Sequence, residues 1–237
     1  MIVDVNKQFF SGMKAAVPVC LGIIPVGISV GLLGVQVGLT EFETVLMSVM
    51  VMAGSAELMV IGMITQGAAL SAMIIGTFFI NLRHVVMSSS VMQKIAGSTT
   101  ITQRFLGAFA LCDESFAIYS LSRDTSYSFL MGTNTALYAG FVGSTVLGSV
   151  LTSFLPQIVI DSFNIAFYAA FLGLLLPSIQ HSLKLSGLVI LTALLNCLLQ
   201  CFLPVSWSII GAMMLGTFIG VFFIDDKDII HDEENTK

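Results

Sequence analysis

Three polar side chains that could bind or protonate a small charged molecule, Asn81, Arg83 and His84, stand in the middle of a long apolar segment. A guanidinium binds a carboxylate through a planar pair of hydrogen bonds, and an imidazole can exchange a proton near neutral pH. In a helix, Arg83 would lie about a quarter turn from a single polar stripe. That stripe consists of Thr77, Asn81, His84 and Ser88.

The segment that carries these residues, about 67–92, is long enough to cross the roughly 30 Å hydrocarbon core of a bilayer as one helix. Arg83 would then lie well inside the membrane, where a central arginine costs about 2.5–3.5 kcal/mol on insertion scales. A residue in that place must face a partner, a cavity or water. We therefore interpret the segment first as a binding site. A structural ion pair inside a helical bundle is the alternative.

Three acidic residues, Glu57, Asp113 and Glu114, also interrupt apolar segments. Excess negative charge is costly at low dielectric, so a carboxyl would be protonated, paired with protonated His84, or matched by a cationic group on a ligand. A zwitterion could meet Arg83 at one end and an acidic residue at the other. The predicted substrate-binding residues are Arg83, Asn81, Glu57, Asp113 and Glu114, and the predicted proton-coupling residues are His84, Glu57 and Asp113. An ion-pair network that locks helices together stays the alternative for the acidic residues.

The composition places the chain in a membrane. Of its 237 residues 56% are hydrophobic and only 10% are charged, and the mean hydropathy is +0.98, whereas a soluble domain has about 25% charged residues. The net charge of -5 comes largely from the carboxyl-terminal tail, so it gives no indication of nucleic-acid binding. We expect an all-α, polytopic membrane protein that contacts lipid.

Long apolar runs predict seven or eight transmembrane helices. The expected organisation is a cytoplasmic amino terminus at 1–14, a transmembrane transporter domain at 15–224 and an acidic cytoplasmic tail at 225–237. The last two runs are divided only by Pro204 and could form a tight hairpin. The predicted spans are about 15–37, 45–64, 67–92, 105–122, 128–151, 163–179, 185–203 and 205–224.

Helix-breaking residues predict that at least one span is interrupted. The first span contains Pro18 and Pro25, followed by Gly27 and Gly31, and proline removes a helical hydrogen bond. We expect a hinge or an unwound stretch at Pro25, Gly27 and Gly54, as in transporters that bind substrate at broken helices. A close-packing seam through Gly27 and Gly31 is the alternative.

Metal and cofactor chemistry have little support in this sequence. Cys197 and Cys201 are four residues apart, but no His or Asp stands near them to complete a metal site. We expect that the protein binds no metal and no cofactor and is not an enzyme, because the chain lacks a His-Glu-x-x-His motif. A phosphate-binding loop is also absent from the sequence.

Four motifs together resemble the AzlC family, the large subunits of branched-chain amino acid exporters. They are the run from Pro18 to Gly27, Ala53-Gly54-Ser55-Ala56, Asn81-Leu82-Arg83-His84 and Asp113-Glu114-Ser115-Phe116. The resemblance covers about residues 9–120. It implies a bacterial inner-membrane exporter of leucine, isoleucine, valine and sometimes methionine, acting with a small, separately encoded membrane subunit of the AzlD type. Glu57 departs from the family's commoner glutamine, and its extra carboxylate bears on substrate charge preference.

Two functions from different classes follow from these observations. The first is proton-coupled export of branched-chain amino acids. The second is a passive channel or facilitator for small zwitterionic solutes, in which Arg83 and the acidic groups form a selectivity constriction. Concentrative efflux that needs the proton gradient would separate them, because a channel cannot move a solute against its gradient.

Overall fold

The protein is described by a computed structural model that covers residues 5–95, 99–156, 158, 162 and 183–223. In these ranges the chain consists of α-helices and has no strand, which confirms the predicted all-α class. The predicted sixth span at 163–179 and the tail at 225–237 lie outside the described residues. The helices are α1 (Val5–Gln36), α2 (Glu41–Val51), α3 (Gly54–Thr65), α4 (Leu70–Lys94), α5 (Ile101–Phe109), α6 (Asp113–Leu121), α7 (Tyr127–Leu151), α9 (Leu183–Gln200) and α10 (Val205–Phe223).

Several of these helices suit a membrane. Among the described helices, α1, α4 and α9 are long and apolar enough to cross a bilayer, and α3 and the Trp207–Phe223 part of α10 are shorter apolar helices. Their surfaces carry many large exposed hydrophobic side chains, such as Leu21 on α1, Phe78 on α4 and Phe222 on α10. Such surfaces are stable in lipid rather than water. The chain is a multi-pass membrane protein.

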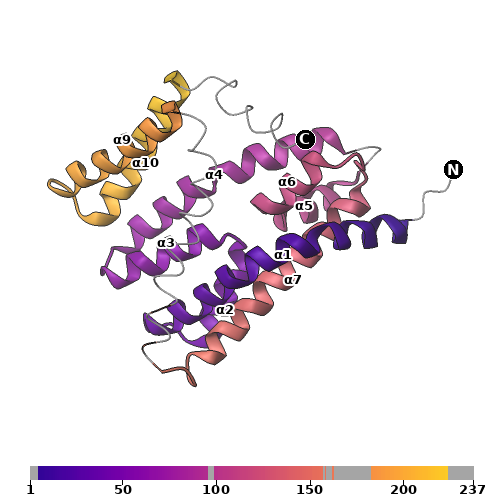
Figure 1. Ribbon diagram of the computed structural model, residues 1–237, viewed down its shortest axis with the longest axis horizontal. Coiled ribbons are helices and arrows are strands. Elements are labelled where there is room, and N and C mark those ends of the chain that lie inside the picture. The colour runs from indigo at the N-terminus through magenta and orange to yellow at the C-terminus, as the bar shows by residue number, and fades with distance from the viewer. Residues whose placement is uncertain (1–4, 96–98, 157, 159–161, 163–182, 224–237) are drawn as a thin grey trace. The chain divides into compact units, whose positions relative to one another are not determined.

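The chain divides into two compact units. The first contains Met1–Gly62 and Ile80–Asn164, and the second contains Met63–Phe79 and Ile165–Lys237. In the second unit α9 and α10 pack as a pair (Figure 1), and Ser208 on α10 donates a hydrogen bond of 3.1 Å to Asn196 on α9. Between these two helices lies a groove of about 470 Å³ whose lining contains no charged side chain.

The centre of the first unit is the pair of α1 and α7, which lie side by side in Figure 1. The contact is close because a Cβ atom on Gly31 of α1 would overlap the Thr145 carbonyl oxygen of α7, and one on Gly148 would overlap the Ile28 carbonyl. Glycine at both positions lets the two backbones touch. The packing-seam interpretation of Gly27 and Gly31 is confirmed, since Gly27 lies equally close to Ser144.

The chain does not unwind at Pro25 and Gly27, so this part of the expectation is wrong, while a hinge at these residues stays a prediction. The helix α1 continues from Val5 to Gln36 with both Pro18 and Pro25 inside it. Near the second proline, the hydroxyl of Ser29 donates a 2.9 Å hydrogen bond to the Pro25 carbonyl, and the tight packing of Gly27 and Gly31 on α7 holds this stretch helical. The helix also begins ten residues before the predicted span at 15–37, because hydropathy reports where a helix becomes apolar and not where it starts.

Two spans that were predicted as single helices are each divided into two helices in the structure. The span predicted at 45–64 breaks at Met52 and Ala53, directly before Gly54, and the span predicted at 105–122 breaks between Phe109 and Asp113. At the first break, Met52 adopts a left-handed conformation with φ of 49°, which stops the helix because the next residues cannot continue the hydrogen-bond pattern. The first unit therefore presents two interior helix starts, those of α3 and α6.

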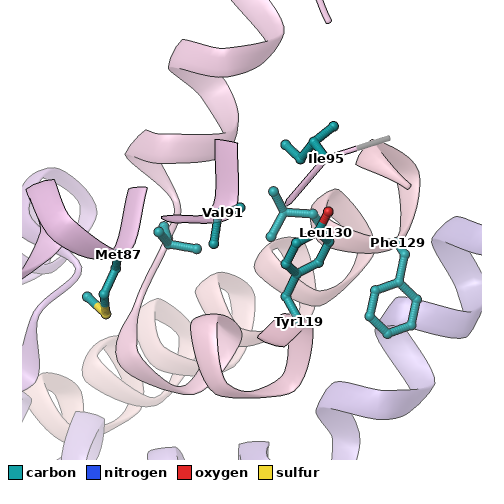
Figure 2. Close-up of a cluster of buried hydrophobic side chains, with 7 residues drawn as sticks. Met87, Val91, Ile95, Tyr119, Phe129 and Leu130 are labelled. Carbon is teal, nitrogen blue, oxygen red and sulfur yellow. The ribbon is translucent and has the colours of Figure 1, made fainter. Parts of the chain in front are cut away.

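A hydrophobic cluster joins the last turns of α4 to α6 and α7 (Figure 2). Met87, Val91 and Ile95 from the α4 side meet Tyr119 of α6 and Leu130 of α7. Tyr119 is completely buried, and its hydroxyl donates a 2.8 Å hydrogen bond to the carbonyl of Thr125. The cluster fixes the carboxyl-terminal half of α4 against α6.

Candidate substrate site at two helix starts

Arg83 connects α4 to the first turns of both interior helices. Its Nη1 lies 2.7 Å from Oδ2 of Asp113, the first residue of α6. Its Nη2 donates a 2.7 Å hydrogen bond to Oγ of Ser55, the second residue of α3. The side chains of Arg83 and Asp113 are 39% and 45% exposed, so the ion pair is open on one side and not sealed in a dry interior.

Two helix starts give this place a positive field. The first N–H groups of α3 and α6 have no helical partners and carry the positive ends of two helix dipoles. The Arg83 guanidinium adds a positive charge at the same place, and Asp113 and Glu114 in the first turn of α6 supply negative charge there. An incoming carboxylate would find a guanidinium and two dipole ends in one position, which is an arrangement that favours anion binding.

Polar atoms next to the ion pair have hydrogen-bonding capacity left. Within the described residues, Arg83 Nε, Asn81 Oδ1 and His84 Nδ1 are buried without a hydrogen-bond partner. Nε and Nη2 form one edge of the guanidinium, and that edge can hold a carboxylate through two parallel hydrogen bonds. A carboxylate bound there would satisfy Nε and share Nη2, which has two hydrogens, with Ser55, while Asp113 could stay on Nη1.

Of the predicted site residues, the structure brings five together. Arg83, Asp113 and the helix neighbours Asn81 and His84 are adjacent, and His84 lies within electrostatic reach of Asp113 and Glu114. Glu114 differs from Asp113 in having no ion pair with a described residue. The group combines a cation, two carboxylates and an imidazole at the junction of α3, α4 and α6.

Glu57 lies elsewhere. It is buried with 1% exposure, and its carboxyl is hydrogen-bonded to the Ser48 hydroxyl on α2 and accepts a hydrogen bond from the backbone N–H of Ala53. Since Ser55 and Glu57 are two residues apart, they point to nearly opposite sides of α3. Glu57 therefore does not meet the Arg83 group through its side chain.

Two residues that position the site were not predicted from the sequence. Ser55 is the α3 contact of Arg83, and Lys94 at the end of α4 donates hydrogen bonds of 2.5 Å and 3.5 Å to the carbonyls of Ser120 and Tyr119. The available signal for Lys94 was a second cation about three helical turns after Arg83 in the same helix. For Ser55 it was a small polar residue among the small residues that precede Glu57.

A string that matches a catalytic motif has a packing role. Gly27-Ile28-Ser29-Val30-Gly31 reads as Gly-x-Ser-x-Gly, but the nucleophilic serine of that motif needs an exposed, strained strand-to-helix turn. Ser29 is 4% exposed inside the continuous helix α1, where its hydroxyl bonds to Pro25. In the part of the chain that the structure describes, no cluster of three or more His, Cys, Asp or Glu side chains could hold a metal ion.

Comparison with known proteins places these features in a family. The family model described as AzlC protein matches residues 18–155, the part that contains Arg83, Asp113 and both helix starts. An uncharacterized membrane protein of Archaeoglobus fulgidus is 33% identical over 177 residues, which are 74% of this chain and 78% of that protein. No solved structure matches.

Two bacterial relatives add to this comparison. Inner membrane protein YgaZ of Escherichia coli is 26% identical over 77% of this chain and 74% of its own length. The branched-chain amino acid transport protein AzlC of Bacillus subtilis is 27% identical over 110 residues, which are 46% of this chain and 42% of that protein. With the family match covering more than half of the sequence, the chain belongs to the AzlC family of membrane transport proteins.

Proposed function

We propose that this protein exports branched-chain amino acids, with Arg83 as the group that binds the substrate carboxylate. The observation that carries the proposal is the half-exposed Arg83–Asp113 pair at the starts of α3 and α6, with Arg83 Nε left unpartnered among the described residues. The substrate class is supported by the name of the Bacillus subtilis relative, branched-chain amino acid transport protein AzlC. Leucine, isoleucine, valine and methionine are the proposed substrates.

The two charged ends of an amino acid fit the two kinds of group in the site. The carboxylate would occupy the Nε–Nη2 edge of Arg83, and the ammonium would face Glu114, with Asn81 Oδ1 as a further acceptor. A zwitterion adds no net charge to the site, so its binding avoids the cost of burying an unpaired ion. The apolar side chain would contribute binding through the hydrophobic effect.

Proton coupling would arise from competition for Arg83. While Asp113 holds Nη1, its negative charge is matched. When a substrate carboxylate engages the guanidinium, Asp113 shares its cation with a second anion and can take a proton, with His84 nearby as a donor or acceptor. We propose Asp113 and His84 as the coupling pair, and a small membrane subunit of the AzlD type as the partner that completes the exporter.

The test is amino acid efflux from cells loaded with dipeptides that contain leucine, isoleucine, valine or methionine. Wild-type protein, expressed with a small AzlD-type subunit, should lower the internal amino acid concentration below the external concentration. Dissipating the proton gradient should stop this concentrative efflux. Arg83→Ala and Arg83→Lys should both abolish efflux while the protein stays folded in the membrane. Arg104→Ala is the matched control, because Arg104 is an exposed arginine of α5 that bonds to Thr99. Normal efflux by folded Arg83→Ala protein would refute the proposal.

The alternative function, a passive channel for zwitterions, predicts a different result in the same assay. Flux would follow the concentration gradient and continue after the proton gradient is dissipated, because a channel has no coupled step. Efflux that stops at equal concentrations inside and outside would favour the channel. Efflux at the full rate without the small subunit would refute the proposal that the protein needs this partner.

A further inference from the structure

The break between α2 and α3 is held by one carboxyl group, that of Glu57. On the α3 side, the backbone N–H of Ala53 donates a 3.1 Å hydrogen bond to Glu57 Oε1. Ala53 precedes the first residue of α3, so its N–H would otherwise be one of the groups that a helix start leaves without a partner. Glu57 therefore completes the start of its own helix.

The other oxygen of the same carboxyl joins two more helices. Ser48 on α2 lies 2.5 Å from Glu57 Oε2, and the Ser48 hydroxyl lies 3.2 Å from that of Thr145 on α7. Glu57, Ser48 and Thr145 are at most 1% exposed. Through this chain of contacts Glu57 connects α3 to both α2 and α7.

We infer that Glu57 is a positioning residue: its buried contacts with Ala53 and Ser48 hold the first turn of α3 so that Ser55, on the opposite side of that turn, meets Arg83. The relationship follows from helix geometry, since residues two apart point about 200° away from each other. Rotating or unwinding this turn would carry Ser55 away from the Nη2 of Arg83, which now lies 2.7 Å from it. The inference rests on the proposed role of Arg83 in binding.

Counting hydrogens shows which side chain can replace Glu57. Three contacts follow one another: Glu57 to Ser48, Ser48 to Thr145, and Thr145 to the Phe141 carbonyl at 3.1 Å. The two hydroxyls supply one hydrogen each. A group that donates to Ser48 and also accepts from Ala53 fills every contact, and a glutamine amide does both. Glu57→Gln therefore keeps the arrangement, whereas Glu57→Ala leaves the Ala53 N–H and the Ser48 hydroxyl without this partner.

The experiment reads the position of α3 separately from transport. Ser55→Cys is placed in the full-length protein in membranes, alone and with Glu57→Gln or Glu57→Ala, and its modification by a small thiol reagent is followed by mass spectrometry, which distinguishes it from the four native cysteines. Glu57→Ala should change the labelling rate of Cys at position 55 at least about fivefold, and Glu57→Gln should leave it unchanged. Glu43→Ala is the matched control, since it removes an exposed carboxylate that caps α2 instead.

The transport arm uses the same Glu57 and Glu43 variants with Ser55 intact. Glu57→Ala should raise the apparent KM for export about tenfold with a smaller change in maximal rate. Glu57→Gln should keep the wild-type KM and maximal rate. Ser48→Ala keeps the contact between Glu57 and Ala53, so it should shift the labelling rate and the KM in the same direction as Glu57→Ala but by a smaller factor. This variant replaces Glu57→Ala in the test if Glu57→Ala does not fold. Unchanged labelling and unchanged KM in folded Glu57→Ala, or in Ser48→Ala if only that variant folds, would overturn the inference. Altered labelling with no effect of Arg83→Ala on export would leave the positioning intact and refute the proposed function instead.

Discussion

Arg83 and Lys94, both on α4, hold opposite ends of α6. Arg83 pairs with Asp113 at the first residue of α6, and Lys94 donates hydrogen bonds to the carbonyls of Tyr119 and Ser120 near its last turn. Each cation meets a different feature of the helix: a carboxylate at the positive end of the dipole and carbonyl groups at the negative end. These contacts tie both ends of the short helix α6 to α4, which keeps Asp113 within reach of Arg83.

Lys94→Ala should loosen α6 without touching the substrate site directly. The loss of a cation on the last carbonyls of a helix costs about 0.3–1 kcal/mol, so we expect a small fall in the melting temperature of the purified protein and a raised apparent KM for export. The measurement is thermal unfolding in detergent together with efflux. Lys14→Ala, which removes an exposed lysine on α1, is the control. Equal effects of the two substitutions would contradict the role of Lys94.

Asp113→Asn should separate binding from coupling. An amide keeps the size of the side chain but cannot ionise, so Arg83 stays free for a substrate carboxylate and the proposed proton exchange at position 113 is lost. We expect binding to persist and efflux against the gradient to disappear, while exchange of labelled leucine for unlabelled leucine continues. Full concentrative efflux with wild-type pH dependence would remove Asp113 from the coupling scheme.

Gly31→Ala should destabilise the pair of α1 and α7. A methyl group on Gly31 would overlap the Thr145 carbonyl and lie 2.5 Å from the backbone nitrogen of Ser149, so the backbones must separate. We expect a loss of about 1–3 kcal/mol, typical of overpacking, measured as a lower melting temperature or faster proteolysis. Gly22→Ala in the same helix is the matched control, because a methyl group there meets nothing within 4 Å. A similar loss for both would contradict the close contact.

Thr40→Ala should weaken the start of α2, outside the apolar spans. Thr40 and Glu43 form a capping box in which each side chain bonds to the other residue's backbone N–H. Replacing a capping threonine by alanine typically costs about 1 kcal/mol. The Thr40 backbone N–H, and then its hydroxyl, hold the pKa of Glu43 below its ordinary value.

The sign of that pKa shift sets the pH dependence of the cap. A lowered pKa means that the folded protein favours the ionised carboxyl, so the stabilisation is present above the ordinary pKa of 4.5 and is lost as the pH falls through the lowered value. The gap in melting temperature between wild type and Thr40→Ala should therefore narrow in acid. A gap that widens as the pH falls would contradict the capping geometry.

The fold class and several helix limits could be predicted from hydropathy. The span predicted at 128–151 became α7, Tyr127–Leu151, because Ser126 caps it with a 3.2 Å hydrogen bond from Phe129 N and a polar loop precedes it. The breaks could not be predicted. Met52 carries no sequence signal for a left-handed conformation, and the contacts that favour it come from Ser48 and Glu57 in the folded chain.

The candidate site was predicted in its residue types and only partly in its geometry. Spacing along α4 predicted that Asn81, Arg83 and His84 belong together. Pairing of Arg83 with Asp113 depends on the break before α6, and the orientation of Glu57 depends on the break before α3, so neither contact could be read from a continuous helix. The prolines of α1 gave a misleading signal, since close packing against α7 keeps that helix intact.

The central claim is that the Arg83 guanidinium holds the carboxylate of the substrate. The most direct test compares the binding of leucine and of leucine amide, which lacks the carboxylate, to the purified full-length protein with its small subunit, for wild type and for Arg83→Ala. Wild type should bind leucine at least about tenfold more tightly than leucine amide, and Arg83→Ala should bind both ligands equally weakly. The same preference for leucine in folded Arg83→Ala protein would contradict the account.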